Sequence, residues 1–188
     1  MKTIGIVPVK SFQRGKSRLA PFLRDSERAE LARALFLHVL DVAQGSAALD
    51  EILVVTDGDD VAALAHERGA SVLRDPPLGA RLGDVVDVAI GHVAGSADAV
   101  LVLMGDLPRL ARSDVSALVG LLADADVVLA PDLRDEDTNA LAMRTADVMR
   151  TAFGHGASFA RHRLLSARAR MTVHRNKNLG FNVDTEHN

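Results

Sequence analysis

Short runs of β-branched and aliphatic residues alternate along this chain with longer segments whose apolar positions recur at helical spacing. Short apolar runs are typical of buried strands, and the helical spacing is typical of amphipathic helices. The pattern predicts strands at residues 3–9, 51–56, 71–73, 99–104, 126–130, 139–143 and 171–174. It predicts helices at residues 25–43, 59–68, 82–93, 113–123 and 158–167, followed by a polar tail.

The alternation of strands and helices also predicts the fold class. Strands that are followed by helices usually form βαβ units around a mainly parallel sheet. We therefore expect an α/β fold with three layers, in which helices cover both faces of one sheet. The chain has 188 residues and no internal repeat or linker, so residues 1–188 are predicted to form a single domain. Asp25 and Ser26 offer N-cap oxygens for the first long helix.

The composition excludes several classes of function. Hydrophobic residues make up 48% of the chain and charged residues 25%, as in soluble globular proteins. Cysteine is absent, which excludes disulfides, thiolate metal sites and cysteine nucleophiles. Trp and Tyr are absent and the net charge is −3, so we expect no nucleic-acid partner. No segment has the apolar length of a membrane span or the order of a signal peptide, so a cytoplasmic location without a membrane partner is expected.

Basic residues gather at the N-terminal end of the chain. Residues 1–24 contain no acidic residue, whereas the rest of the chain holds all 25 acidic residues and only 16 basic ones. A cationic loop on an acidic chain suggests one local anionic ligand, although charge alone leaves a solvated basic turn equally open. The six basic residues of this segment are Lys2, Lys10, Arg14, Lys16, Arg18 and Arg24.

Ligands of open α/β sheets bind beyond the carboxyl ends of the strands, so polar residues that follow strands are the candidate site residues. The spacing after the first strand matches neither the Walker A loop nor the dinucleotide-binding glycine motif. Lys16 and Arg18 could still hold a triphosphate, because Arg grips phosphate oxygens in bidentate fashion and Lys supplies a compact charge. This first set consists of Pro8, Val9, Lys10 and the run Gly15-Lys16-Ser17-Arg18.

Two carboxylates are candidate metal ligands. Asp106 follows the predicted strand at residues 99–104, and a carboxylate placed beside phosphates usually holds Mg²⁺. The alternative is that Asp106 caps the turn before Pro108. Asp184, near the C-terminus, is the second candidate, with a solvated tail residue as its alternative.

A further set surrounds the start of the last predicted helix. Ser158 is suited to be its N-cap, and the glycines before it leave backbone N–H groups open, so the turn could bind an anion. A plain capped helix is the alternative. His155 and His162 are seven residues apart, which is not a usual zinc spacing, and are interpreted as polar pocket or surface groups. The candidate binding residues here are Thr138, Asn139, Gly154, Gly156 and Ser158.

Taken together, these residues resemble the CofC family of guanylyltransferases, which act in the biosynthesis of the deazaflavin coenzyme F-420. The resemblance covers nearly the whole chain. Its most specific part is Thr138-Asn139-Ala140-Leu141 followed by Ser158-Phe159-Ala160-Arg161-His162. The other matching segments are Ile6-Val7-Pro8-Val9-Lys10, Lys16-Ser17-Arg18-Leu19, Gly105-Asp106-Leu107-Pro108 and Val183-Asp184-Thr185.

The resemblance implies a Rossmann-like fold of the nucleotide-diphospho-sugar transferase type. It implies that GTP reacts with a phosphorylated three-carbon acid to give a guanylylated acid and pyrophosphate, and that the enzyme can form a homodimer. The family's acids are 2-phospho-L-lactate, phosphoenolpyruvate and 3-phospho-D-glycerate. The implied roles are catalysis by Lys16, Arg18 and Asp106, nucleotide binding by Pro8, Val9, Lys10, Lys16 and Arg18, Mg²⁺ binding by Asp106 and Asp184, and acid binding by Thr138, Asn139, Gly154, Gly156 and Ser158.

Two stretches depart from the family pattern. Residues 78–83 replace a Gly-Leu-Asn-Ala-like stretch that is associated with the nucleotide base. The turn at residues 154–158 is one residue longer than the common Gly-Pro-Gly-Ser, which leaves room for an extra hydroxyl and favours 3-phospho-D-glycerate, with His155 as its partner. Two alternatives remain: another nucleotidyl- or glycosyltransferase of the same fold that acts on a sugar phosphate or molybdopterin, and a non-catalytic GTP-binding domain.

Overall fold

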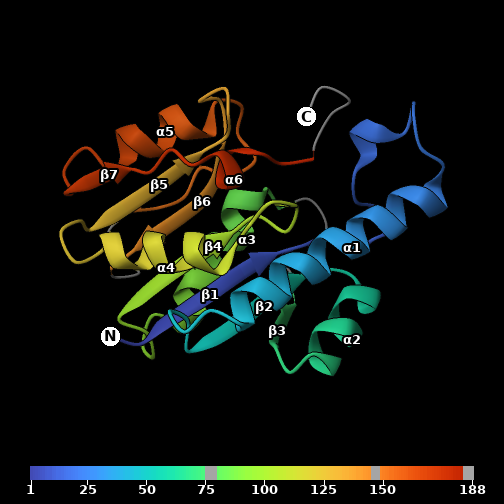
Figure 1. Cartoon of the computed structure of the whole chain (residues 1–188), viewed down its shortest axis with the longest axis horizontal. Helices are drawn as coiled ribbons and strands as arrows, with labels where there is room; N and C mark the ends of the chain where they lie inside the picture. The colour runs from blue at the N-terminus through green and yellow to red at the C-terminus, as the bar shows by residue number, and fades with distance from the viewer. Residues whose placement is uncertain (75–79, 145–148, 184–188) are drawn as a thin grey trace.

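The computed structural model describes residues 1–74, 80–144 and 149–183, which form one sheet with helices on both faces (Figure 1). The strands are β1 (Thr3–Pro8), β2 (Glu51–Thr56), β3 (Ser71–Arg74), β4 (Ala99–Leu103), β5 (Val127–Pro131), β6 (Thr138–Met143) and β7 (Met171–Val173). The helices are α1 (Asp25–Gln44), α2 (Asp59–Glu67), α3 (Leu82–Val93), α4 (Arg112–Leu121), α5 (Ser158–Leu165) and α6 (Lys177–Gly180), with a short 3₁₀ helix η1 (Ser17–Leu19).

The seven strands lie in the order β3-β2-β1-β4-β6-β5-β7. Strands β1 to β4 run parallel, β6 is antiparallel to both of its neighbours, and β7 is parallel to β5. The predicted mainly parallel α/β sheet is therefore confirmed. Because β6 runs against β4, its first residue, Thr138, lies at the edge where β4 ends. The loops after β1 and β4 thus meet the start of β6.

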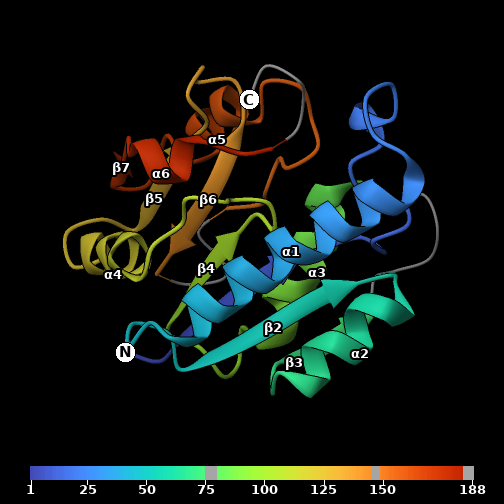
Figure 2. The same cartoon turned by 45° about the vertical axis from the view of Figure 1, so that its right-hand side comes forward.

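A separate apolar core lies on each face of the sheet. Helices α1, α2 and α4 cover one face, and α3 and α5 cover the other (Figures 1 and 2). Side chains of neighbouring strand residues point to opposite faces, so Val7 and Leu101 belong to the core under α1 and α4, while Ile6 and Val102 belong to the core under α3. Burial on both faces explains why these strands are continuous apolar runs in the sequence.

Three segments differ from the sequence prediction, one in the N-cap of a helix and two in containing a short helix. Helix α1 begins at Asp25, with Arg24 as its N-cap in place of Asp25 or Ser26, and the carboxylate of Glu27 accepts the Arg24 N–H at 2.8 Å. The loop after β1 contains η1, and the predicted polar tail contains α6, which is capped by Asn176 Oδ1. Both short helices lack the apolar periodicity that makes longer helices recognisable.

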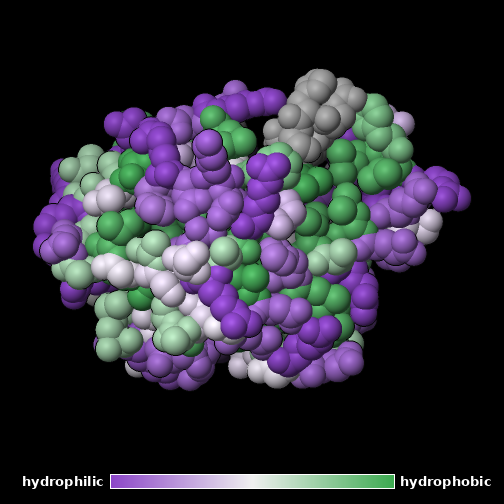
Figure 3. Space-filling view, in the orientation of Figure 1, coloured by the Kyte–Doolittle hydropathy of each residue, from purple (hydrophilic) through white to green (hydrophobic). Residues whose placement is uncertain are grey.

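The surface bearing α1 and α4 mixes polar side chains with small apolar patches (Figure 3). Scattered apolar side chains are normal on a folded protein and define no continuous stripe. In the three described ranges, no helix combines the length and the apolar composition of a transmembrane segment.

Candidate active site

A cavity of about 580 Å³ lies at the carboxyl edge of β1 and β4, where the sheet geometry predicts a ligand. Its walls come from the loop after β1, the start of α3, the end of β4, the start of β6 and the turn before α5. Asp184 lies outside the described residues. All the other site residues expected from the sequence line this cavity: Pro8, Val9, Lys10, Lys16, Arg18, Asp106, Thr138, Asn139, Gly154, Gly156 and Ser158.

The loops after β1 and β4 approach each other closely at the cavity floor. A Cβ atom on Gly105 would lie 2.6 Å from Val9 Cγ2, so a larger residue at position 105 would push the two loops apart. Glycine at this position allows the residues after β1 and Asp106 after β4 to share one wall.

Lys16 and Asp106 form an ion pair in this wall. Their side chains are only 9% and 19% exposed, so the pair is shielded from most of the solvent. Lys16 adopts a left-handed backbone conformation with φ of 54°, which is uncommon for a residue other than glycine and occurs preferentially at functional sites. The arrangement places a cation and a carboxylate side by side, as a site for phosphate and metal requires.

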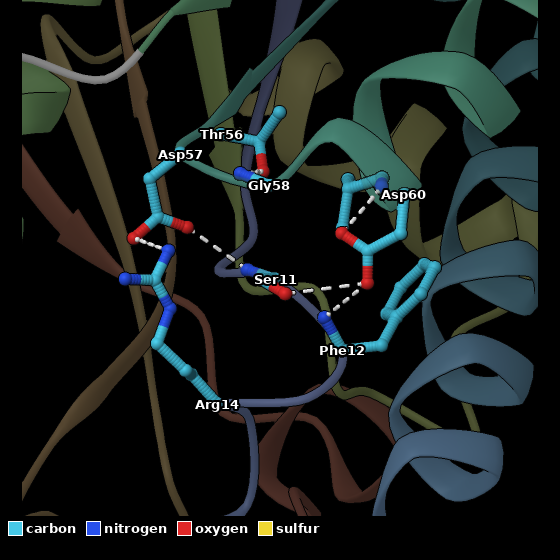
Figure 4. Close-up of polar contacts among 8 residues, drawn as sticks. Ser11, Phe12, Arg14, Thr56, Asp57, Gly58 and Asp60 are labelled. Carbon is cyan, nitrogen blue, oxygen red and sulfur yellow. Dashed lines mark hydrogen bonds and ion pairs between the residues drawn. The ribbon is translucent and has the colours of Figure 1, made fainter.

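A network of hydrogen bonds fixes the start of the cationic loop against the turn between β2 and α2 (Figure 4). Asp57 accepts the Ser11 N–H at 2.9 Å and forms an ion pair with Arg14 at 2.8 Å. Asp60 accepts the Phe12 N–H at 2.9 Å. The network positions the loop whose later residues line the cavity. The positioning role of the two aspartates is not evident from the sequence, because each accepts a hydrogen bond from a loop more than 40 positions earlier in the chain.

The start of β6 is joined to the turn before α5. Thr138 donates its N–H to Ser158 Oγ at 3.0 Å, and the Ser158 hydroxyl donates to Asp137 Oδ1 at 2.9 Å. The prediction that Ser158 caps α5 is therefore wrong: the N-cap is Ala157, with φ of 57°, and the Ser158 hydroxyl connects the turn to β6. The two hydrogen bonds of the Ser158 side chain hold the glycine-rich turn at the cavity.

The Asn139 side chain ties the C-terminal segment to the sheet. Its amide donates to the Leu179 carbonyl at 2.9 Å, and its Oδ1 accepts from Asn182 Nδ2 at 3.2 Å. Val183 then donates its N–H to the Asp106 carbonyl at 3.3 Å. The segment that precedes Asp184 is therefore held beside Asp106. The amide of Asn139 faces this segment, so its described contacts are structural.

The two histidines singled out in the sequence differ in environment. His155 is half-buried and lines the cavity, in agreement with its interpretation as a pocket group. For His162 the interpretation as a pocket or surface group is wrong, because His162 is fully buried and is not part of the cavity lining. His162 Nε2 accepts the Ala152 N–H, and Nδ1 lies 2.8 Å from Thr138 Oγ1. Burial lowers the pKa of His162 from 6.5 to about 4, although the negative charge of Asp137 opposes this effect in part.

This lowered pKa predicts a pH-dependent contribution to stability. The unfolded chain binds the proton more tightly than the folded one, so the contribution is fully present at pH 7 and is lost as the pH falls from 6.5 through about 4. This contribution of His162 to the free energy of unfolding is about 3 kcal/mol. The difference in the free energy of unfolding between wild type and His162→Gln should therefore shrink by about that amount between pH 7 and pH 4. Urea titrations at several pH values measure it, and a difference independent of pH would contradict a buried neutral imidazole.

The fold is similar to those of nucleotide-sugar enzymes. The putative nucleotide-diphospho-sugar transferase from Desulfovibrio desulfuricans G20 has a TM-score of 0.77 at 16% identity, covering 98% of this chain and 84% of that chain. Glucosyl-3-phosphoglycerate synthase from Mycobacterium tuberculosis, solved with Mn²⁺, UDP and glucosyl-3-phosphoglycerate, has a TM-score of 0.65 at 15% identity, covering 93% and 69%. At these identities the two structures show a similar fold and nothing more, and they confirm the fold type that the sequence predicts.

The sequence match decides the family. The family model described as "Guanylyl transferase CofC like" matches residues 2–187. The chain belongs to the CofC family. This CofC protein is therefore a nucleotidyltransferase of the guanylyltransferase type, as the resemblance implies.

Relatives of this CofC protein carry names with three different acids. The phosphoenolpyruvate guanylyltransferase of Sphaerobacter thermophilus is 36% identical, over 98% of this chain and 89% of the relative. The 3-phospho-D-glycerate guanylyltransferase of Phenylobacterium zucineum is 38% identical over 88% and 76%. The 2-phospho-L-lactate guanylyltransferase of Methanothermobacter thermautotrophicus is 35% identical over 86% and 70%. These similar identities do not single out one acid.

Proposed function

We propose that this CofC enzyme transfers GMP from GTP to a phosphorylated three-carbon acid and releases pyrophosphate. The observation that carries the proposal is one cavity that brings together the cationic loop, Asp106 and the glycine-rich turn. Such a cavity can hold two phosphorylated molecules with their reacting groups adjacent. The family resemblance supports a cytoplasmic role in the biosynthesis of coenzyme F-420.

The cationic loop is the proposed binding site for the triphosphate. Lys10 and Arg18 are exposed at the cavity, and Lys16 lies deeper, beside Asp106. Pro8 and Val9 would offer backbone to the nucleotide. The three cations would stabilise the negative charge that grows on the leaving pyrophosphate.

The carboxylates in the cavity fit a magnesium ion. They are Asp106 and Asp137, and Asp137 Oδ1 already accepts hydrogen bonds from Ser158. Within the described residues, no group of three or more His or acidic side chains is arranged to hold a metal. Proteins usually bind Mg²⁺ through one or two carboxylates together with substrate phosphates, so we assign Asp106 and Asp184 as its protein ligands. When bound, Mg²⁺ would neutralise phosphate charge.

The proposed reaction is an in-line displacement at phosphorus. A phosphate oxygen of the acid forms a bond to the α-phosphorus of GTP as the bond to the pyrophosphate oxygen breaks. A phosphate dianion is already a nucleophile, so positioning and charge neutralisation matter more than a strong general base. Lys16 and Arg18 would hold the donor phosphates. Thr138 and the backbone N–H groups of the turn at residues 154–158 would hold the acid.

The proposed acid is 3-phospho-D-glycerate. Its extra hydroxyl needs a polar partner, and half-buried His155 lines the cavity beside Gly154 and Gly156. A site that hydrogen-bonds a hydroxyl strongly rejects analogues that lack it. Residues 80–82 line the cavity and belong to the stretch that the resemblance associates with the nucleotide base, whereas residues 78 and 79 lie outside the described residues.

Pyrophosphate release tests this function. The protein is incubated with Mg²⁺, each nucleoside triphosphate and either a phospho-acid or a sugar phosphate, and GTP binding is measured separately. The three acids then compete at equal concentration. We expect release with GTP and product mainly from 3-phospho-D-glycerate. Product mainly from another acid would contradict the role of His155 but not the reaction. Release only with a sugar phosphate would favour a different transferase, and GTP binding without release would favour a non-catalytic domain.

A further inference from the structure

A buried histidine lies behind the acid-binding side of the cavity. His162 projects from α5, and both of its ring nitrogens have partners: Nε2 is 2.8 Å from the Ala152 N atom, and Nδ1 is 2.8 Å from Thr138 Oγ1. The Phe153 ring packs against the imidazole with the ring centroids 4.7 Å apart and the planes at 64°. These contacts fix the orientation of the imidazole.

The contacts also fix which ring nitrogen carries hydrogen. The backbone N–H of Ala152 can only donate, so His162 Nε2 accepts and carries no hydrogen. A neutral imidazole then has its hydrogen on Nδ1. The bond between His162 and Thr138 therefore runs from Nδ1–H to the threonine oxygen.

The direction of this bond determines what the Thr138 hydroxyl can do. Its oxygen accepts from His162, so its own hydrogen must point to another acceptor. Within the described residues, the hydrogen-bond partner of Thr138 Oγ1 is His162 Nδ1, and Thr138 lines the cavity. A molecule bound in the cavity can supply the acceptor that this hydroxyl hydrogen needs.

We propose that His162 is a positioning residue that holds the Thr138 hydroxyl as a hydrogen-bond donor toward an anionic group of the phospho-acid. The proposal rests on the proposed function, which places the acid at Thr138. An O–H donor aimed at a carboxylate or phosphate forms a charge-assisted hydrogen bond, which is stronger than a neutral one. Asp137 is a neighbouring charge that also lines the cavity, and its Oδ1 accepts from Ser158 N–H and Oγ–H.

Two substitutions separate the two functions of the ring. His162→Gln puts an amide near the position of Nε2, where it can still accept the Ala152 N–H, but it leaves no donor for Thr138. His162→Asn puts the amide near Nδ1, where it can donate to Thr138, and is the matched control. Thr138→Val removes the hydroxyl with little change of shape. KM values for the acid and for GTP are measured separately for each variant.

We expect His162→Gln to raise the KM for the acid about tenfold and to change the KM for GTP by less than about twofold. His162→Asn should raise the acid KM less than His162→Gln does. In the Thr138→Val background, His162→Gln should add less than about a twofold change, because both act through one hydrogen bond. The proposal would be overturned if His162→Gln raised the acid KM as much in the Thr138→Val background as in the wild type. It would also be overturned if the KM for GTP changed as much as the KM for the acid.

Nitrogen NMR of the imidazole in the wild-type protein tests the inference without turnover. The proposal requires a hydrogen on Nδ1 and none on Nε2 at pH 7. A hydrogen on Nε2 would overturn the inference, whatever reaction the enzyme catalyses. The required tautomer in a protein that releases no pyrophosphate would instead contradict the proposed function. The NMR measurement keeps the inference falsifiable if His162→Gln does not fold, because a hydrogen on Nε2 would still overturn it.

Discussion

Asp106→Asn should lower kcat for pyrophosphate release roughly a thousandfold, while the protein stays folded with a somewhat lower melting temperature because Lys16 loses an ion-pair partner. The amide keeps the shape of the side chain but lacks the charge that pairs with Lys16 and that a magnesium ion needs. The fold should survive because Asp106 lies at a partly exposed strand end, outside both apolar cores. Steady-state assays at saturating GTP and acid, together with thermal unfolding, measure the two effects.

Asp124→Asn is the matched control for this substitution. Asp124 is exposed in the loop after α4 and outside the cavity, and its replacement changes the net charge by the same amount. We expect the control to release pyrophosphate at the wild-type rate. Near-normal release by Asp106→Asn would contradict the assignment of Asp106 to metal and phosphate.

Lys16→Ala should lower kcat/KM for GTP roughly a hundredfold, because the cation nearest to Asp106 would no longer neutralise the triphosphate. Arg18→Lys should lower it about tenfold, since lysine keeps the charge but loses the bidentate geometry of the guanidinium. Initial rates at varied GTP concentration and fixed saturating acid give the ratio for each variant.

Arg33→Ala is the control for the two cations. Arg33 is exposed on α1 and does not line the cavity, so its loss tests whether a general change of charge affects the reaction. Its kcat/KM for GTP should equal that of the wild type. If Lys16→Ala behaves like this control, the loop after β1 is a solvated basic turn.

The strands and the longer helices could be predicted because burial makes their sequence patterns distinct. Strand β2 has the same bounds in prediction and structure, since its apolar run is enclosed on both sides by polar residues. The direction of β6 was not predictable, because an apolar run has the same pattern in a parallel and in an antiparallel strand. That direction brings Thr138 to the cavity.

The candidate site was predictable only in part, for a related physical reason. Residues that follow strands, such as Lys16 and Asp106, can be located by the rule that ligands bind at the carboxyl edge. Asp57 also directly follows a strand, β2, and therefore satisfies this rule. The sequence does not show that Asp57 and Asp60 hold the loop after β1, because the residues they contact there lie more than 40 positions earlier in the chain. The role of His162 depends on a contact with Thr138, 24 positions earlier, which no local pattern reveals.

The most direct test of guanylyl transfer follows the phosphorus atoms of GTP. The protein is incubated with Mg²⁺, 3-phospho-D-glycerate and GTP radiolabelled at either the α- or the γ-phosphorus, and the products are separated. We predict that the α-label is joined to the acid and that the γ-label leaves in pyrophosphate, with Asp106→Asn as the inactive control. An α-label retained in GDP, with the γ-label in orthophosphate or on the acid, would contradict guanylyl transfer.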